Sequence, residues 1–448
     1  MSSALAPPIT VRGMKKLDKN AFKKEVDVPC LRLKSHLISI PDILAGLKAQ
    51  TIRLAKIKAF QYLPEEPGMR IAVFDPDKVA AWEEIDAKDR LMELGVSADA
   101  FFLKTIHFSW ENWTSGEILQ AIIGDDGPNV AGFSTVGHIV HLNLRPEHDA
   151  FKQVVGEVIL DKIPCCRSVI NKTNVIDNEF RNISYEVLAG SEDLQTVVKE
   201  NACTFHLDYA HVYWNPRLGR EHERLTQEIP SNALMYDVFA GIGPFAVPAG
   251  KRGCTVLAND LNPVSYDYLL KNITLNKVGN RVTAYNLDGR DFIRTVVKDN
   301  MILQWKCNPN ASIHIVMNLP ALAEEFVDVF RGLFHGSESD VPADRNSLPT
   351  VHLYCFDKTD DPRGVPLDRL DRNIGWKMDR HAIDRHFVRQ VAPSKDMIRL
   401  RFLLPWELLT AAREETLVSS TESILIREEE DISDSVIPEP DSKRRKIV

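Results

Sequence analysis

A glycine-rich turn between two apolar segments constrains this chain more than any other stretch. Residues 233–238 form an apolar run that carries Asp237 near its end, and residues 239–244 form the turn. Gly241 and Gly243 let the backbone bend sharply and approach a ligand without Cβ clashes. A strand, a tight turn and a helix start is the form in which an open α/β sheet presents a nucleotide-like ligand. Because the turn lacks the third glycine of GxGxxG and a GK[ST] sequence, it does not identify that ligand by itself.

From this turn onward, short buried strands alternate with helices. The pattern predicts strands at residues 233–238, 255–258, 281–286, 312–317 and 350–355, helices at 263–277 and 323–334, a surface loop at 336–347, and a final strand pair at 386–391 and 397–403. Such alternation indicates a parallel sheet with right-handed crossovers. We therefore predict an α/β fold with a mostly parallel, seven-stranded sheet that ends in an antiparallel pair.

The chain before the turn predicts smaller modules. We expect disorder over residues 1–20 and a first module over 21–120, in which 77–94 favours a helix and 101–108 a strand. A small α+β module follows over residues 121–210. Its predicted elements are a helical piece within 115–132, a helix at 147–161, and strands at 139–144, 169–175 and 184–188.

The net charge of −8 is concentrated at the C-terminus. Residues 414–448 hold ten acidic and five basic side chains, and this acidic, serine-rich tail is typical of disorder. The rest of the chain is near neutral, so global charge does not indicate a nucleic-acid-binding protein. Basic residues within 39–59 form either a solvated face or a surface that binds RNA, because charge patterning does not separate the two.

Several features bear on location and metals. The seven cysteines are scattered and none forms CxxC, which predicts reduced thiols inside a cell and no metal site. No apolar run reaches the ~18 residues of a membrane span. The basic end at 443–446 resembles a short nuclear-import signal. The first 17 residues lack acids, as in some mitochondrial transit peptides. We expect the cytoplasm and nucleus, with the mitochondrial matrix as an alternative.

Four consecutive predicted strands end in polar residues: Asp237, Asp260, Asp288 and Asn318. Each of them alone is explained by turn chemistry. Together they lie where ligands bind in open α/β sheets, beyond the carboxyl ends of the strands. Asp260 is near the spacing at which an acid meets a ribose diol, and Asp288 stands where an adenine amino group donates. Since the turn holds no lysine or arginine for a pyrophosphate, S-adenosylmethionine fits better than NAD or ATP.

The segment 213–229 carries clear helix signals. Asn215 is a good N-cap and Pro216 suits the first helical position. Glu221 follows on the second turn. Its simplest interpretation is an ion pair with Arg217 or Arg224, which lie four and three residues away.

These motifs together resemble the archaeal and eukaryotic tRNA (guanine(37)-N1)-methyltransferase family. The resemblance covers roughly residues 10–410 and rests on DVFAGIGPFAVPAG (237–250), Asp260, DGRD (288–291), NLP (318–320), YWNPRL (213–218) and VAPSKD (391–396). It implies a Rossmann-like, class I methyltransferase domain over residues 211–413, which uses S-adenosylmethionine. It also implies two smaller α+β domains, over 21–120 and 121–210, that engage tRNA.

The resemblance assigns roles residue by residue. It implies Glu221 and Arg181 as catalytic residues; His222, Asp260, Leu261, Asp288, Gly289 and Asn318 as cofactor contacts; and Tyr213, Asn318 and Pro320 as substrate contacts. Taken without the resemblance, Arg181 is a surface arginine that pairs with an acid such as Glu179, and His222 is a helix-surface histidine.

The chemistry explains why these residue types are needed. Guanine N1 must lose a proton before it becomes nucleophilic, and a carboxylate such as Glu221 accepts it. Negative charge then spreads onto O6, which a guanidinium such as Arg181 stabilises.

We therefore expect a monomeric enzyme that methylates N1 of guanosine 37, next to the anticodon in the tRNA anticodon loop. One alternative is a wybutosine-pathway enzyme that moves the aminocarboxypropyl group to a modified guanosine 37. Another is an RNA-binding scaffold with a degenerate cofactor domain, which the intact acids at the strand ends disfavour.

Overall fold

The computed structural model describes residues 4–125, 127, 130, 132–176, 183–341, 347–359 and 361–412. The chain divides into two compact units. The first unit comprises Met1–Gly132, Leu144–Ile170 and Val187–Ser191, and the second comprises Phe133–Asn143, Asn171–Glu186 and Glu192–Val448. Within the described ranges, every helix is too short or too polar to cross a membrane.

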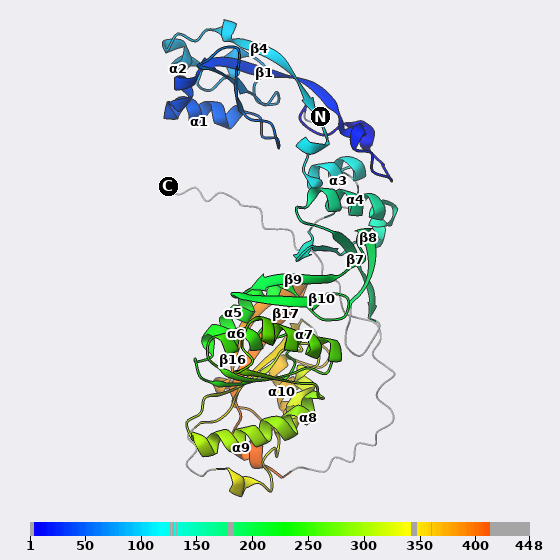
Figure 1. Ribbon diagram of the computed structural model, residues 1–448, viewed down its shortest axis with the longest axis vertical. Helices are drawn as coiled ribbons and strands as arrows, with labels where there is room; N and C mark the ends of the chain where they lie inside the picture. Colours follow the sequence, from blue (N-terminus) through cyan, green and yellow to red (C-terminus); the bar gives the residue numbers. More distant parts are fainter. Residues whose placement is uncertain are drawn as a thin grey trace. The chain divides into compact units, whose positions relative to one another are not determined.

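An antiparallel four-stranded sheet forms the core of the first unit. Its strands are β1 (Lys24–Lys34), β2 (Phe60–Tyr62), β3 (Met69–Val73) and β4 (Phe101–Phe108), in the order β2-β3-β1-β4. Helices α1 (Pro41–Gln50) and α2 (Lys88–Glu93) pack against this sheet (Figure 1). Leu31 and Leu33 of β1 meet Ile43 and Leu47 of α1 and Leu91 of α2 in one apolar cluster. Thus β4 confirms the strand predicted at residues 101–108.

Two local predictions are wrong in this unit. The helix predicted over 77–94 is reduced to α2 and a short 3-10 turn at Trp82–Glu84, because the Asp75 side chain caps a preceding turn and Trp82 enters the core. Disorder was predicted over residues 1–20, but the described residues 4–20 are held in place. Val11 is buried, and the backbone N–H of Gly13 donates to the Ile122 carbonyl at 2.7 Å.

A second sheet also has four strands, which come from the middle of the chain. It has the order β5-β6-β7-β8, with bounds Ser134–Val136, Ile139–Leu142, Ser168–Ile176 and Ile183–Gly190. Helices α3 (Ser115–Ile123) and α4 (Lys152–Lys162) belong to the same stretch. A capping box between Thr114 and Glu117 begins α3. The predicted elements of this module are present, with α4 shorter than predicted because Pro146–Phe151 is a 3-10 helix.

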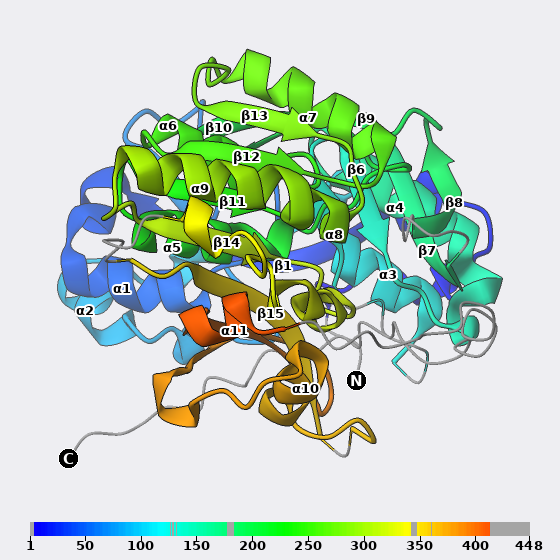
Figure 2. The ribbon, with the colours of Figure 1, turned by 90° about the horizontal axis from the view of Figure 1, so that it is seen from below.

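The second unit is built on a seven-stranded sheet in the order β13-β12-β11-β14-β15-β17-β16. Figure 2 shows the succession from β13 through β12, β11 and β14 to β15. The strands are β11 (Leu234–Asp237), β12 (Thr255–Asn259), β13 (Val282–Tyr285), β14 (Ile313–Met317), β15 (Thr350–Lys358), β16 (Asp384–Ala392) and β17 (Lys395–Leu403). The first five are parallel, and β17 runs antiparallel to both β15 and β16. This confirms the predicted mostly parallel sheet and its antiparallel pair.

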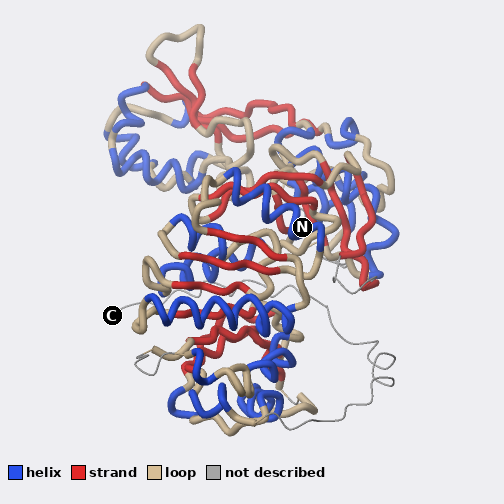
Figure 3. The backbone as a smooth tube through the Cα atoms, turned by 60° about the horizontal axis from the view of Figure 1, so that its bottom comes forward, coloured by secondary structure: helices blue, strands red, loops and turns tan. Residues whose placement is uncertain are grey.

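Helices flank this sheet, and Figure 3 shows its strands as successive red segments with blue helices beside them. The helices are α5 (Gly219–Glu228), α6 (Ala246–Lys251), α7 (Pro263–Leu275), α8 (Gly289–Phe292), α9 (Lys298–Cys307), α10 (Pro366–Ile374) and α11 (Trp406–Thr410). A large apolar core packs Tyr236, Ile315 and Leu353 of the sheet against Met301 and Trp305 of α9. The helix predicted at residues 323–334 is instead a 3-10 helix at Ala323–Phe330.

An antiparallel hairpin of β9 (Gln195–Glu200) and β10 (Cys203–Asp208) precedes α5 and is joined to α7 by side-chain amides. Asn272 makes paired hydrogen bonds with the backbone of His206, and Asn276 does the same with Thr204, at 2.7–3.1 Å. Residues four apart lie on one face of a helix, so the two amides match alternate residues of the strand edge. These hydrogen bonds fix the position of the hairpin, and with it Glu200, against α7.

Candidate active site

The glycine turn after β11 has the predicted geometry. Gly241 has φ of 54° and Gly243 has φ of 99°, both in the region that favours glycine. A Cβ on Gly243 would lie 2.8 Å from Leu269 and Val247, so packing requires a glycine there. A Cβ on Gly241 would meet nothing within 4 Å. The turn is therefore closed toward the core at Gly243 and open at Gly241.

Asp260 ties this turn to the neighbouring strand. Its Oδ2 accepts the backbone N–H of Gly241 at 2.7 Å, and its Oδ1 accepts that of Asn262 at 2.9 Å. Burial raises the pKa of the Asp260 carboxyl, and these two backbone donors oppose the rise. The side chain of Asn259 adds a second tie, to the backbone of Val238 and Leu287. Residues that follow β11, β12 and β13 are thereby held at one edge of the sheet.

Two polar side chains at this edge have unsatisfied atoms. Neither carboxyl oxygen of Asp237, which is fully buried, makes a hydrogen bond with a described residue, and the same holds for Oδ1 of Asn318. Burial, reinforced by the charge of Asp260, raises the pKa of Asp237 well above its usual range. The backbone N–H of Phe239 opposes this rise but does not reach hydrogen-bond geometry with either oxygen. Buried polar groups are normally paired. Unpaired ones beside an open glycine turn suit a polar ligand.

Asp288 and Gly289 begin the short helix α8. The Asp288 side chain accepts the backbone N–H groups of Arg290 and Asp291 at 2.8 and 3.4 Å. A Cβ on Gly289 would lie 3.0 Å from Phe239 and 3.2 Å from Phe326, so a larger residue would strain this corner.

Leu261 lies beside that corner and is exposed. The Asn286 amide holds the carbonyls of Asp260 and Leu261, at 2.7 and 3.0 Å. The predicted cofactor residues that follow β12 and β13 thus lie on two segments that Asn259 and Asn286 join by hydrogen bonds.

Glu221 lies in the first turn of α5 and is 6% exposed. Arg224 binds both of its carboxylate oxygens, with Nη2 to Oε1 at 2.6 Å and Nε to Oε2 at 2.7 Å. Tyr354 of β15 donates its hydroxyl to Oε1 at 2.7 Å, and His386 Nε2 lies 3.7 Å from Oε2. Of the two ion pairs predicted for Glu221, the structure has the one with Arg224. The cap is also as predicted, since Asn215 accepts from the backbone of Arg217 at 3.1 Å.

His222 is buried, so the surface-histidine alternative is wrong. Its Nδ1 lies 2.7 Å from Oε1 of Glu200. Its ring meets Phe245 edge-on at 4.7 Å, and Phe245 stands 5.8 Å from the ring of Tyr354. This aromatic contact links the end of the glycine turn to the surroundings of Glu221.

Two further predicted residues, Tyr213 and Pro320, are at least partly accessible to solvent. Tyr213 is 56% exposed, and the Asn215 amide approaches its hydroxyl at 3.4 Å. Pro320 follows β14 and is half-buried. Arg181 lies outside the described residues.

No sequence pattern points to Tyr354, whose hydroxyl donates to Glu221 from the middle of a strand. It stands within the predicted strand 350–355 at what the pattern treats as a core position. Glu228 was also missed. It accepts hydrogen bonds from Arg224, Arg399 and Arg401 at 2.7–3.0 Å, and Arg399 is buried.

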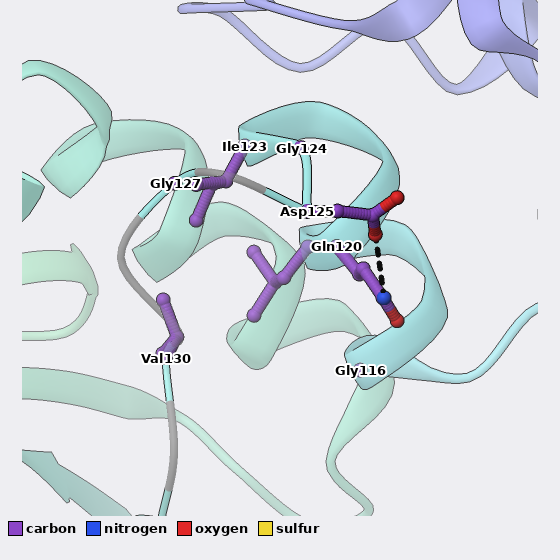
Figure 4. Close-up of a pocket in the computed structure, with 8 residues that line it drawn as sticks. Gly116, Gln120, Ile123, Gly124, Asp125, Gly127 and Val130 are labelled. Carbon is purple, nitrogen blue, oxygen red and sulfur yellow. Dashed lines mark hydrogen bonds between the residues drawn. The ribbon is translucent and has the colours of Figure 1, made fainter.

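Two cavities lie away from the glycine turn. One, of about 330 Å³, is in the first unit and is lined largely by α3, where Gln120 donates to Asp125 at 2.8 Å (Figure 4). The other, of about 490 Å³, is in the second unit beside Glu200, Trp214 and Arg220. None of the predicted site residues that the structure describes lines either cavity.

A parallel sheet with polar residues at its carboxyl edge, a glycine turn after its first strand and an antiparallel final pair defines a class I methyltransferase. Comparisons agree with this class. Residues 196–335 match the family model of the TRM5/TYW2 methyltransferase domain, and residues 116–193 match that of the TYW2 N-terminal domain.

Named relatives narrow the class to a family. The chain is 42% identical over 410 residues to the tRNA (guanine(37)-N(1))-methyltransferase of Xenopus tropicalis, covering 90% of this chain and 81% of the relative. It is 39% identical over 408 residues to the human enzyme of that name, covering 90% and 79%. A solved complex of aTrm5 with tRNALeu has the same fold, with a TM-score of 0.57, 22% identity, and 84% and 99% coverage. The protein belongs to the tRNA (guanine(37)-N1)-methyltransferase family.

Proposed function

We propose that this protein transfers a methyl group from S-adenosylmethionine to N1 of guanosine 37 in tRNA. Membership of the family supports this reaction. A second support is that the same unit contains both a sheet edge suited to the cofactor and a carboxylate on α5 suited to act as the base. The observation that carries the proposal is the position of the Glu221 carboxylate in the second unit. It accepts a hydrogen bond from Tyr354, which lies on the seven-stranded sheet. The complex of aTrm5 with tRNALeu supports tRNA as the substrate.

The polar atoms at the sheet edge fit S-adenosylmethionine. The unpaired atoms of Asp237 and Asn318 and the open space at Gly241 suit a polar nucleoside. We assign its contacts to His222, Asp260, Leu261, Asp288, Gly289 and Asn318. When bound, S-adenosylmethionine supplies an electrophilic methyl group on a sulfonium. An acid-lined edge suits that positive charge.

The guanine side is assigned to residues on other segments. Glu221 accepts the N1 proton as general base. Arg181 binds O6 and stabilises the negative charge that develops there. Tyr213 offers an exposed ring for stacking, and Asn318 and Pro320 border the base. Because N1 is paired inside a duplex, the base must come from a single-stranded loop or turn out of its stack. We assign residues 21–120 and 121–210 to tRNA recognition.

The product nucleoside tests this function. The protein is incubated with methyl-labelled cofactor and unmodified tRNA that carries guanosine 37, and the RNA is digested to nucleosides. We expect labelled 1-methylguanosine, and none with a tRNA that carries adenosine 37. Absence of 1-methylguanosine would contradict the proposal. Product mass separates methyl transfer from aminocarboxypropyl transfer, and calorimetry with S-adenosylmethionine separates either enzyme from an RNA-binding scaffold.

A further inference from the structure

The two oxygens of the Glu221 carboxylate are occupied unequally. Oε1 accepts two hydrogen bonds, from Tyr354 Oη at 2.7 Å and from Arg224 Nη2 at 2.6 Å. Among the residues that the structure describes, Oε2 accepts one, from Arg224 Nε at 2.7 Å. A carboxylate has about four acceptor positions, two on each oxygen. Oε1 is therefore filled, and Oε2 retains one acceptor position.

His386 does not fill that position. Its Nε2 lies 3.7 Å from Oε2, beyond the length of a hydrogen bond. The side chain of His386 is 38% exposed, whereas Tyr354 on the other oxygen is fully buried. The free acceptor position thus belongs to the oxygen beside the more open neighbour.

We propose that Tyr354 is a positioning residue for the reaction, which with Arg224 fixes the Glu221 carboxylate so that Oε2 receives the N1 proton of guanine. This inference rests on the proposed function. In the step, the N1–H bond breaks, the proton bonds to Oε2, and the electron pair stays on N1 as the nucleophile.

Tyr354 is suited to act only as a donor. Burial, and after it the charge of Glu221, raises the pKa of the Tyr354 hydroxyl well above its usual range, so the hydroxyl keeps its proton. The residue lies within β15, which pairs with β14 on one side and β17 on the other. A side chain on a central strand has little freedom, so its hydroxyl holds Oε1 in one place.

Arg224 is held in turn. Its Nη1 donates to Glu228 Oε2 at 2.7 Å, and Glu228 also accepts from Arg399 at 2.7 Å and from Arg401 at 3.0 Å. Both of these arginines lie on β17. The fork of Arg224 on Glu221 is thus anchored to the same sheet, because Arg399 is the register partner of Tyr354 on the neighbouring strand.

The first test is Tyr354→Phe, measured by single-turnover methyl transfer at saturating cofactor and tRNA. Loss of a hydrogen bond to a charged group should lower the rate about tenfold or more, with both dissociation constants unchanged within about twofold. Tyr236→Phe is the matched control, because Tyr236 is an equally buried tyrosine of the same sheet whose hydroxyl binds Asn300 at 2.9 Å. It should leave the rate unchanged. An unchanged rate in Tyr354→Phe, or weaker binding at an unchanged rate, would overturn the inference.

The second test separates positioning from structural support. In a Glu221→Gln background, Tyr354→Phe should have no further effect on the residual rate, because residues that act as one unit are not additive. If the effects multiply, Tyr354 acts independently of Glu221 and the inference is wrong. If the wild-type protein makes no 1-methylguanosine, both the proposed function and this inference are wrong. If the wild type is active and Tyr354→Phe is equally fast, only the inference is wrong.

Discussion

The backbone N–H of Gly241 donates to Oδ2 of Asp260 at 2.7 Å, which joins the glycine turn after β11 to the end of β12. The two residues are 19 positions apart in the chain. They meet because β11 and β12 are parallel neighbours, with Asp237 opposite Ala258 in the register. This hydrogen bond holds the turn against the end of the neighbouring strand.

Asp260→Asn should weaken S-adenosylmethionine binding about tenfold to a hundredfold. The substitution removes the charged acceptor that holds the turn, and it removes a carboxylate that would bind the ligand. Calorimetry measures the affinity. Asp267→Asn is the control, since Asp267 is exposed on the same segment, in α7. Equal affinities for the two variants would contradict the role of Asp260.

Alanine at the two glycines should separate stability from binding. Gly241→Ala should cost about 1–2 kcal/mol of stability for its positive φ and should weaken cofactor binding strongly, because the new methyl enters the open space. Gly243→Ala should destabilise the fold more, because its methyl meets Leu269 and Val247. Thermal unfolding and calorimetry report the two effects. If Gly241→Ala were less stable than Gly243→Ala, the open position of the turn would be Gly243 and not Gly241.

Asn318→Ala should lower methyl transfer at least about tenfold and leave the unfolding midpoint nearly unchanged, because its Oδ1 makes no hydrogen bond that folding would lose. Asn310→Ala, at the exposed start of the same strand region, should change neither quantity. A large loss of stability in Asn318→Ala would mean that the side chain is structural.

Glu221→Gln should reduce the single-turnover rate by about 10²–10⁴ and leave cofactor affinity unchanged, as expected for the loss of a general base. Glu223→Gln on the exposed face of α5 is the control and should be as active as the wild type. Parallel losses of rate and of affinity in Glu221→Gln would argue for a binding role.

Acid should destabilise the protein partly through Glu228. Burial opposes its ionisation, but the hydrogen bond and charge of Arg399, with Arg401, outweigh burial and lower its pKa from 4.5 to about 2. Because the folded-state pKa is depressed, the ionised group stabilises the fold above pH 4.5, and this is lost as pH falls toward 2. The difference is worth about 3 kcal/mol.

Denaturant midpoints at several pH values measure this effect. Glu228→Gln should lower stability at neutral pH, since it leaves buried Arg399 without that partner. Its disadvantage relative to the wild type should shrink between pH 4.5 and 2. A constant difference across that range would show that Glu228 is not the group involved.

The sequence by itself determined the local features of the second unit. The glycine turn, the strand before it and the cap at Asn215 were predictable because turn chemistry and hydrophobic periodicity act over a few residues. The acids after β12 and β13 could be placed at one edge because parallel strands end together. Local rules failed at the N-terminus, where burial of Val11 overrode a polar, disorder-like composition.

Only the tertiary structure decided how distant side chains meet. Tyr354 and Glu221 are 133 positions apart, and His222 and Glu200 are 22 apart on different elements. In the sequence, Tyr354 is indistinguishable from a core aromatic, because a period-two strand pattern reports burial and not the partner of a hydroxyl. The strand order that places β15 and β17 beside α5 is a long-range choice. The environment of the proposed base therefore depends on packing, whereas the glycine turn depends on sequence.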